Sequence, residues 1–289
     1  MEWYADSKGL IPETEWRKQI DELEALSKPS TKEDVKKAVI NAIQSRIPKQ
    51  KFGVFLSGGV DSSFIALICK HAKADFICYG IGMEGAPDLQ WAEKVAKELK
   101  LTLRTRSFTL QEVAPYFEKA ASILKTPDVL GVGIGALVIA AVELAKKDGI
   151  TVLIGGLGSE EIFAGYNRHL VSDNVHEECW RGMKEVMYHR DLERDCALAK
   201  AAGVSVMTPF LDKDLIRIAM GIPSEKKINE KQKKIILREI AEELGLPKDV
   251  AWRDKKAAQY GSWFDKALKK ISKQNNIYKQ DFVKQLIPS

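Results

Sequence analysis

Hydrophobic and polar positions change their period several times between residues 31 and 154. Four short apolar runs have the length of buried strands, and they span residues 52–56, 74–81, 101–106 and 150–154. Helical spacing fills the intervals, and the expected helices cover residues 61–72, 88–99, 109–124 and 136–145. Strands that alternate with helices predict an α/β fold, in which a parallel sheet carries helices on both faces.

The chain on either side of this region has a different pattern. A capping box that starts at Thr31 opens a helix, which Pro48 ends. We expect residues 1–30 to form a short, peripheral N-terminal extension and residues 31–289 to form the domain. After residue 165 the pattern becomes mainly helical, with helices expected at 176–202, 212–220, 231–244 and 262–271.

The strand at 52–56 leads directly into a glycine turn and a helix start, in the segment Leu56-Ser57-Gly58-Gly59-Val60-Asp61-Ser62-Ser63. Such a turn leaves backbone N–H groups free to hold an anion, and the helix dipole favours negative charge there. No lysine closes the loop, so the Walker pattern is absent. The three serine hydroxyls can donate to phosphate oxygens, whereas Asp61 needs a bridging Mg²⁺. The alternative is an ordinary turn in which Asp61 and Ser62 cap the helix.

Three glycine turns follow expected strands, at residues 57–59, 80–82 and 155–156. Open parallel sheets bind ligands at the carboxyl ends of their strands, where these turns would gather. A nucleotide is the ligand that this arrangement favours. The third turn continues into Gly158, Ser159, Glu160 and Glu161, so Glu160 could complete a Mg²⁺ site opposite Asp61. The alternative is a helix that Ser159 caps, with acids in its first turn.

Two further charged groups have both a structural and a functional interpretation. Asp191 and Arg194 lie one helical turn apart, as a surface ion pair would, or as a pair that orients a polar substrate beside the pocket. Lys255 follows Trp252 and Arg253, and it is either a solvated lysine or a cation for a phosphate-rich transition state.

The 289-residue composition, with 45% hydrophobic and 29% charged residues, is that of an ordinary globular domain. The net charge of +5 arises largely in a lysine-rich C-terminal third. Its lysines form either a patch for phosphates or RNA or, as we favour, a solvated helix face; they are Lys226, Lys227, Lys231, Lys233, Lys234, Lys255 and Lys256. Nucleic acid is therefore not an expected partner.

Cysteine and histidine spacing predicts neither a disulfide nor a zinc site. The four cysteines, Cys69, Cys78, Cys179 and Cys196, lie far apart, as free thiols in a reducing compartment would. We find no apolar stretch long enough to span a bilayer and no signal peptide at Met1 to Asp6. We expect a cytoplasmic protein without a membrane partner.

Five motifs occur in the order seen in asparagine synthetase, so the chain resembles that family over roughly residues 31–272. They are Ser57-Gly58-Gly59-Val60-Asp61-Ser62-Ser63, Gly156-x-Gly158-Ser159-Glu160-Glu161-x-Phe163-x-Gly165-Tyr166, Asp191-x-x-Arg194-Asp195, Pro209-Phe210-Leu211-Asp212 and Trp252-Arg253-x-Lys255. The first motif alone indicates the wider ATP pyrophosphatase group, with its adenine nucleotide alpha hydrolase-like fold. The ordered set is specific to the asparagine synthetase and β-lactam synthetase branch.

This resemblance implies that ATP activates a substrate carboxylate, aspartate among the candidates. The carboxylate attacks the α-phosphate, pyrophosphate leaves, and ammonia or an amine then displaces AMP to form an amide. The implied pyrophosphate ligands are Ser57, Gly58, Gly59, Asp61, Ser62 and Ser63, and the implied adenosine contacts are Leu56, Ile81, Gly82 and Gly156. Asp61 and Glu160 would bind Mg²⁺, Asp191 and Arg194 the substrate, and Lys255 would stabilise charge on the phosphates.

Three positions depart from the family pattern. Glu2 stands where glutamine-using members carry a nucleophilic Cys, so we expect free ammonia, an amine or a separate glutaminase as the nitrogen source. Glu160 is usually Asp. Leu157 replaces a Glu that is thought to help deprotonate the amine, and leucine accepts no proton. Glu161, Tyr188 and His189 are candidate replacements. Two alternatives are a catalytically reduced ATP-binding regulatory protein and an ATP pyrophosphatase that acts on tRNA.

Overall fold

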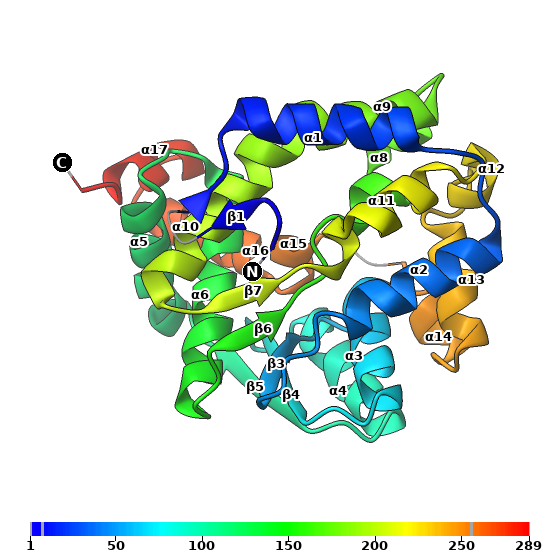
Figure 1. The fold of residues 1–289 in the computed structure, drawn as a ribbon. Coiled ribbons are helices and arrows are strands. Elements are labelled where there is room, and N and C mark those ends of the chain that lie inside the picture. Colours follow the sequence, from blue (N-terminus) through cyan, green and yellow to red (C-terminus); the bar gives the residue numbers. More distant parts are fainter. Residues whose placement is uncertain (1, 7–8, 255–256, 289) are drawn as a thin grey trace.

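A five-stranded parallel sheet forms the centre of the computed structural model, which describes residues 2–6, 9–254 and 257–288 (Figure 1). The strand order is β5-β4-β3-β6-β7. The strands are β3 (Phe52–Phe55), β4 (Phe76–Met83), β5 (Leu103–Phe108), β6 (Val152–Ile154) and β7 (Ser205–Met207). The first four confirm the predicted strands. The pattern missed β7, because Ser205–Met207 begins with a polar residue and lies outside any run like that at 150–154, which revealed the equally short β6.

Helices cover both faces of the sheet, which confirms the predicted α/β class. They are α2 (Lys32–Gln44), α3 (Val60–His71), α4 (Pro87–Glu98), α5 (Leu110–Leu124) and α6 (Val129–Lys147). Successive strand residues point to opposite faces. Val54 and Cys78 therefore join the core under α2, α3 and α4, whereas Tyr79 and Leu153 pack toward α6.

The second half of the chain is mainly helical, as predicted. Its α-helices are α7 (Ser159–Ile162), α8 (Asn167–Leu170), α9 (Val175–Arg181), α10 (Glu193–Ala202), α11 (Lys213–Met220), α12 (Ser224–Lys227), α13 (Ile235–Glu243), α14 (Lys248–Ala251), α15 (Ala258–Gly261), α16 (Phe264–Gln274) and α17 (Lys279–Gln285). Two π-helical turns, η1 (Gly182–Val186) and η2 (Tyr188–Leu192), connect α9 to α10, and η3 (Pro209–Leu211) is a 3₁₀ turn.

Helix α6 is longer than predicted, because the glycine-rich stretch before Ala136 is also helical. Asp128 caps it by accepting hydrogen bonds from the backbone N–H groups of Leu130 and Gly131. With 19 residues and a mean hydropathy of 2.0, it is long and apolar enough to cross a membrane, contrary to our expectation. More than half of it, 56%, is buried inside the protein, where it packs against α5, α10 and α16. That packing is typical of a core helix.

The first thirty residues are not peripheral. They form the strands β1 (Ala5–Asp6) and β2 (Gly9–Leu10) and the helix α1 (Glu13–Leu26). Trp16 is fully buried in the main core, and its indole N–H donates to the carbonyl of Met183 at 2.9 Å. Trp3 stacks on Trp16 with the ring centroids 5.0 Å apart. Large aromatic side chains are stabilised when their area is buried against other residues. This explains why α1 lies along the body of the protein (Figure 1).

Candidate active site

The first and third glycine turns meet at the carboxyl end of the sheet. Strands β3 and β6 are parallel neighbours, with Val54 opposite Ile154, so the turns that follow them emerge side by side. A Cβ atom added to Gly156 would lie 3.1 Å from the Cβ of Asp61. A side chain at residue 156 would pack very tightly against Asp61, so glycine lets the third turn approach it closely.

The turn after β3 is held open by backbone conformation and not by side-chain caps. Gly58 has φ +67°, and a Cβ atom there would lie 2.5 Å from the Cβ of Trp91. Gly59 is the N-cap of α3 and makes no side-chain cap hydrogen bond. Because glycine has no side chain, this observation does not decide whether Asp61 and Ser62 serve the helix start or a ligand. Both interpretations stay predictions.

The serines of this turn differ in their hydrogen bonds. The Ser57 N–H donates to Ser62 Oγ at 3.3 Å, and Ser62 Oγ donates to the Gly59 carbonyl at 3.3 Å. The Ser63 hydroxyl is buried and has no hydrogen-bond partner within the described part of the chain. The hydrogen bonds of Ser62 are long and the hydroxyl of Ser63 is unpaired, which is typical of donors whose acceptor is a ligand.

A lysine that sequence reasoning had not placed here joins the two acids. The ammonium of Lys234 donates to Asp61 Oδ1 at 2.9 Å and Oδ2 at 2.8 Å, and it lies 2.8 Å from Glu160 Oε1. It also donates to Ser159 Oγ at 2.9 Å, and Ser159 in turn donates to Glu160 Oε2 at 2.8 Å. Asp61 and Glu160 thus converge on the ammonium of Lys234, and their role as Mg²⁺ ligands stays a prediction.

The local backbone brings Lys234 to this position. It precedes α13 with φ +57°, a left-handed conformation that is unusual for a non-glycine residue. A Cβ atom on Gly165 would collide with Lys234 Cε, so the glycine leaves the passage for the lysine stem. The predicted helix 231–244 consequently begins only at Ile235. The interpretation of these lysines as a solvated helix face is wrong for Lys234 and Lys227, which are both buried.

Charge balance explains why a buried lysine is stable here. Burial disfavours the ammonium, but the nearby carboxylates of Asp61 and Glu160 outweigh this effect and raise the pKa of Lys234. Glu160 keeps a side chain that is 36% exposed and Asp61 one that is 18% exposed, whereas the Lys234 side chain is only 6% exposed. Both carboxylates therefore keep part of their surface exposed to solvent, although the lysine that they share is buried.

The donor set fits a divalent cation. Mg²⁺ is usually held by one or two carboxylates together with phosphates and water, and the ammonium of Lys234 marks the point that two carboxylates share. The described residues contain no group of three or more His, Cys, Asp and Glu side chains that could hold a metal ion by themselves. Asp61 and Glu160 would therefore hold such an ion only with help from a ligand.

The predicted adenosine contacts lie at the same edge of the sheet. β4 continues past the end of β3, so Ile81 and Gly82 reach beyond the first turn, and the Leu56 N–H donates to the Tyr79 carbonyl at 2.9 Å. A Cβ atom on Gly82 would lie 2.9 Å from Ala86 Cβ. Close packing onto the start of α4 is thus sufficient to require glycine at this position.

Asp191 and Arg194 form a buried network and not a surface ion pair. Their side chains are 3.1 Å apart and almost completely buried. Arg190 links them to the segment that follows the third turn, because its Nη2 donates to Asp191 Oδ2 at 2.5 Å and to Glu161 Oε1 at 2.8 Å. Burial and the nearby charge of Asp191 raise the pKa of Glu161 to about 7. The network therefore extends to the residue beside Glu160.

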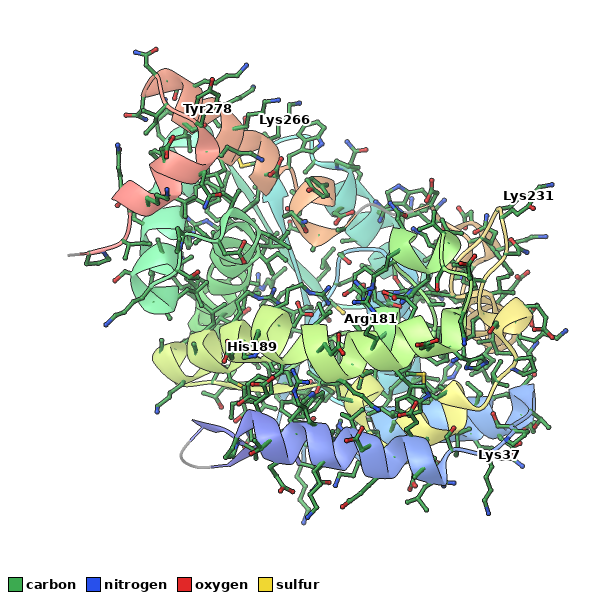
Figure 2. All side chains as sticks on the ribbon, turned by 90° about the horizontal axis from the view of Figure 1, so that it is seen from above. Lys37, Arg181, His189, Lys231, Lys266 and Tyr278 are labelled. Atoms are coloured by element: carbon green, nitrogen blue, oxygen red, sulfur yellow. The ribbon has the colours of Figure 1, made fainter. Side chains whose placement is uncertain are left out.

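The three candidate replacements for the acid at Leu157 lie in different places. His189 is exposed and pairs with Glu13 and Glu193, on the side of the protein that α1 covers (Figure 2). The Tyr188 hydroxyl donates to the Ile11 carbonyl at 2.6 Å. Glu161 follows Glu160 directly in the chain, and its carboxylate accepts a hydrogen bond from Arg190 Nη2 at 2.8 Å.

Similarity to known proteins identifies the family of this chain. Residues 32–174 and 168–280 match the model of the family described as Asparagine synthase. The chain belongs to the asparagine synthase family. Over 95% of its length it is 32% identical to a putative glutamine-hydrolysing asparagine synthetase 1 of Methanocaldococcus jannaschii, of which the match covers 58%. Over 84% of its length it is 32% identical to asparagine synthetase B of Escherichia coli, of which the match covers 48%.

The chain thus spans about half the length of these curated relatives. The solved structure of NMN synthetase from Francisella tularensis matches 88% of this chain at 13% identity and a TM-score of 0.43. That similarity is too low to bear on function. The family membership agrees with the order of the five motifs and with the parallel sheet.

Another family motif of this asparagine synthase domain reaches the first turn. Arg253 Nη1 donates to the Ser57 carbonyl at 3.0 Å, and its Nη2 donates to Asp88 Oδ1 at 2.8 Å. Its guanidinium also lies over the ring of Trp91, 4.9 Å from the centroid. Lys255, the predicted catalytic cation, lies outside the described residues. Arg253 was not singled out from the sequence, although its place in the Trp252-Arg253 motif was the available signal.

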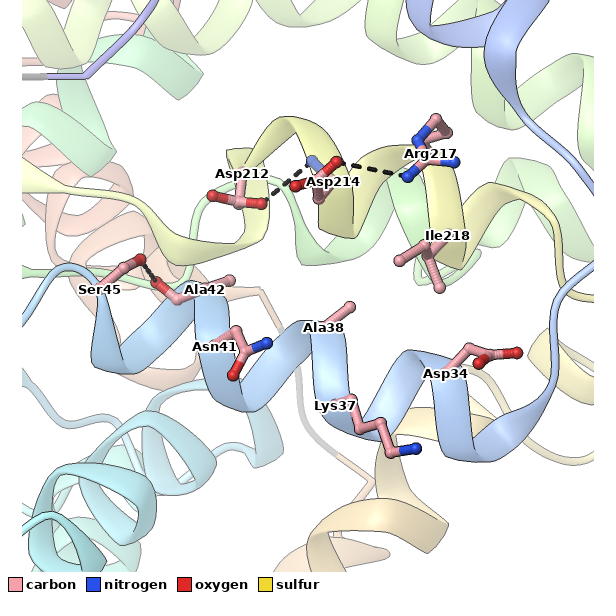
Figure 3. A pocket seen from close by; sticks show the side chains of 10 residues that line it. All are labelled: Asp34, Lys37, Ala38, Asn41, Ala42, Ser45, Asp212, Asp214, Arg217 and Ile218. Carbon is pink, nitrogen blue, oxygen red and sulfur yellow. Dashed lines mark hydrogen bonds and ion pairs between the residues drawn. The ribbon is translucent and has the colours of Figure 1, made fainter.

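The Pro209–Asp212 motif forms a packing corner, with Pro209, Phe210 and Leu211 buried. Leu211 is fully buried, and a Cβ atom on Gly158 would lie 2.6 Å from Leu211 Cδ2. Asp212 also lines a surface groove of about 480 Å³ between α2 and α11 (Figure 3). None of the described residues predicted to bind nucleotide, metal or substrate lines this groove, so it is separate from the candidate active site.

Proposed function

We propose that this chain is an ATP-dependent ligase that joins a carboxylate to ammonia or an amine and forms AMP. The substrate carboxylate attacks the α-phosphate of ATP, pyrophosphate leaves, and the nitrogen nucleophile then displaces AMP from the acyl adenylate. One observation carries the proposal. Asp61 and Glu160 converge on a single cation position beside the Ser57–Ser63 turn, at the carboxyl end of the parallel sheet.

The turn after β3 would hold the pyrophosphate portion of ATP. Backbone N–H groups near Gly58 and Gly59 lie at the start of α3, where the helix dipole favours phosphate. The hydroxyls of Ser57, Ser62 and Ser63 would donate to phosphate oxygens. Leu56, Ile81, Gly82 and Gly156 would line the adenosine, since they lie on neighbouring strand ends.

Asp61 and Glu160 would hold Mg²⁺, which neutralises charge on the phosphates when it is bound. Lys255 would stabilise the negative charge that develops in the adenylation step. Asp191 and Arg194 would orient the substrate from their buried network, and aspartate is our first candidate carboxylate. With aspartate and ammonia the product is asparagine, and the chain would serve asparagine biosynthesis in the cytoplasm.

The nitrogen source is the least constrained part of this proposal. Leu157 offers no proton acceptor, and Glu161 is our first candidate because it follows Glu160 directly in the chain and its pKa is raised to about 7. Ammonia would arrive free or from a separate glutaminase. Leu157 also supports a second candidate function, a nucleotide-binding regulatory protein with reduced catalysis.

The test is a joint assay of pyrophosphate and AMP with ATP, Mg²⁺, ammonia and a panel of carboxylates that includes aspartate. We expect equal amounts of both products with at least one carboxylate. Asp61→Asn should lower the rate at least about a hundredfold, whereas Asp214→Asn, on an exposed side chain of α11, should leave it unchanged.

The second candidate function predicts a different result. ATP would bind by calorimetry with no AMP formed on any carboxylate, and Leu157→Glu would restore turnover. Turnover by the unaltered protein would exclude that candidate. No turnover by either protein, together with no ATP binding, would overturn the proposed function.

A further inference from the structure

We propose that Lys234 is a built-in counter-ion that excludes a free divalent cation from the nucleotide-free protein. The metal then enters only together with the triphosphate, which gives the displaced ammonium a new anionic partner. This inference rests on the proposed function, because it concerns the same cation position. It adds an order of binding that the family membership does not specify.

The contacts of Lys234 leave no room for a second cation between the acids. Its ammonium carries three N–H donors, and four oxygens from Asp61, Ser159 and Glu160 lie within 2.9 Å of it. Both carboxylate oxygens of Asp61 are among them. A divalent ion that binds these acids must therefore push the ammonium away from them.

The cost of that displacement depends on what else is bound. One ammonium leaves the Asp61–Glu160 pair with a residual negative charge, so a divalent ion alone is attracted. The same ion repels the ammonium, and the repulsion is strong where the lysine is buried. A triphosphate adds several negative charges at the helix N-terminus and can accept the hydrogen bonds that Lys234 loses. Metal and nucleotide should accordingly bind with positive coupling.

The backbone around Lys234 supports a dedicated position for this side chain. The residue has a left-handed φ of +57°, and Gly165 provides the space for its stem. The preceding loop is closed by the bridge between Ile228 and Lys233 and carries Lys231 at its exposed tip (Figure 2). After Lys234, Arg238 Nη1 donates to the carbonyl of Ala251 at 2.6 Å. Lys234 thus lies between an exposed loop and a fixed helix.

The first experiment uses the unaltered protein and Mn²⁺ as the probe, with free Mn²⁺ followed by electron paramagnetic resonance. We expect weak binding of Mn²⁺ alone and at least about tenfold tighter binding when a non-hydrolysable ATP analogue is present, within the usual range of coupling between ligands. Equal affinity for Mn²⁺ with and without the analogue would overturn the proposal.

The second experiment compares two buried lysines. Lys234→Met should bind Mn²⁺ without nucleotide at least about tenfold more tightly than the unaltered protein. Lys227→Met is the matched control, because Lys227 is fully buried but contacts the sulfur of Met220 at 3.6 Å and not the acids. The control should keep the affinity of the unaltered protein. The same weak Mn²⁺ binding in both variants would contradict the proposal.

Thermal unfolding supplies a readout that does not need activity. Mg²⁺ without nucleotide should raise the Tm of Lys234→Met and leave that of the unaltered protein nearly constant. If Lys234→Met does not fold without metal, refolding that depends on Mg²⁺ is the supporting result. If the variant folds in neither condition, the Mn²⁺ titration of the unaltered protein decides. A protein that forms no AMP but shows this coupling would lose the proposed function and keep the inference.

Discussion

Two buried lysines of this protein lie seven residues apart and have opposite environments. Lys227 and Lys234 are both almost completely withdrawn from solvent. Lys234 lies between Asp61 and Glu160, and their charges raise its pKa despite burial. Burial lowers the pKa of Lys227 to about 8, and no carboxylate lies within ion-pair distance of it among the described residues. The ammonium of Lys234 neutralises part of the charge of two carboxylates, whereas that of Lys227 has no such partner among the described residues.

The difference shows what burial of a charge means in a candidate active site. Burial alone lowers the pKa of a lysine, as at Lys227. A lysine that stays charged under the same burial needs an equivalent negative charge, and here this charge comes from two turns on neighbouring strands. The acids around Lys234 therefore form a prepared cation position, and the predictions that follow test this contrast.

Lys234→Met should cause the largest loss of stability. Two carboxylates would lose their buried counter-ion, and we expect the free energy of unfolding to fall by about 2–4 kcal/mol, below the value for a fully buried pair because Glu160 is partly exposed. Chemical denaturation at pH 7 without Mg²⁺ measures it. A loss smaller than that of an exposed ion pair would break the contrast with Lys227.

Lys227→Met should have the opposite sign. Removal of an unpaired buried charge should raise the free energy of unfolding by about 1–3 kcal/mol at pH 7. The folded-state pKa of Lys227 is lowered to about 8, so the unaltered protein gains stability as the pH rises from there toward the unfolded value. The advantage of the variant should therefore shrink above pH 8. Destabilisation at pH 7 would show that Lys227 has a favourable role that its contacts do not reveal.

Glu161→Gln should change the pH dependence of stability. The folded-state pKa of Glu161 is raised to about 7 from its ordinary value of 4.5, so its contribution is present at low pH and is lost as the pH rises between these values. Unfolding curves from pH 5 to pH 8 should fall less steeply for the variant, with a difference of about 1–2 kcal/mol across the range. Parallel curves for the two proteins would mean that Arg190 keeps Glu161 ionised throughout.

Asp214→Asn should have the smallest effect. Asp214 pairs with Arg217 at 3.4 Å on the surface of α11, and its side chain is 81% exposed. We expect a change of no more than about 0.5 kcal/mol in the free energy of unfolding. A larger change in the same denaturation assay would mean that exposed pairs also contribute strongly here, and the special status of the buried site would be weakened.

The sheet and its first four strands could be predicted from the sequence, because short strand-like runs alternate with helical spacing along residues 52–154. The convergence of Asp61 and Glu160 could be predicted as well, since both follow strands of one parallel sheet. Strand β7 could not, because Ser205–Met207 begins with a polar residue, whereas the equally short β6 lies within the run at 150–154. The burial of α1 also needed the structure, since the partner of Trp16 lies at Met183.

Lys234 shows most clearly why part of the site was beyond sequence reasoning. Its neighbours in sequence are exposed or half-buried lysines, so a local pattern indicates a solvated face. Its function arises from contacts with residues 61, 159 and 160, which no periodicity connects to residue 234. Its left-handed backbone also delays the start of the predicted helix to Ile235. The one sequence feature related to this position was Gly165, whose lack of a side chain leaves space for the side chain of Lys234.

A crystal structure with Mn²⁺ and a non-hydrolysable ATP analogue tests the central claim most directly. We predict an anomalous Mn²⁺ peak that both Asp61 and Glu160 coordinate, phosphates on the Ser57–Ser63 turn, and the Lys234 ammonium moved onto phosphate oxygens. A structure in which Lys234 still joins the two acids, while metal and nucleotide bind elsewhere, would contradict the account.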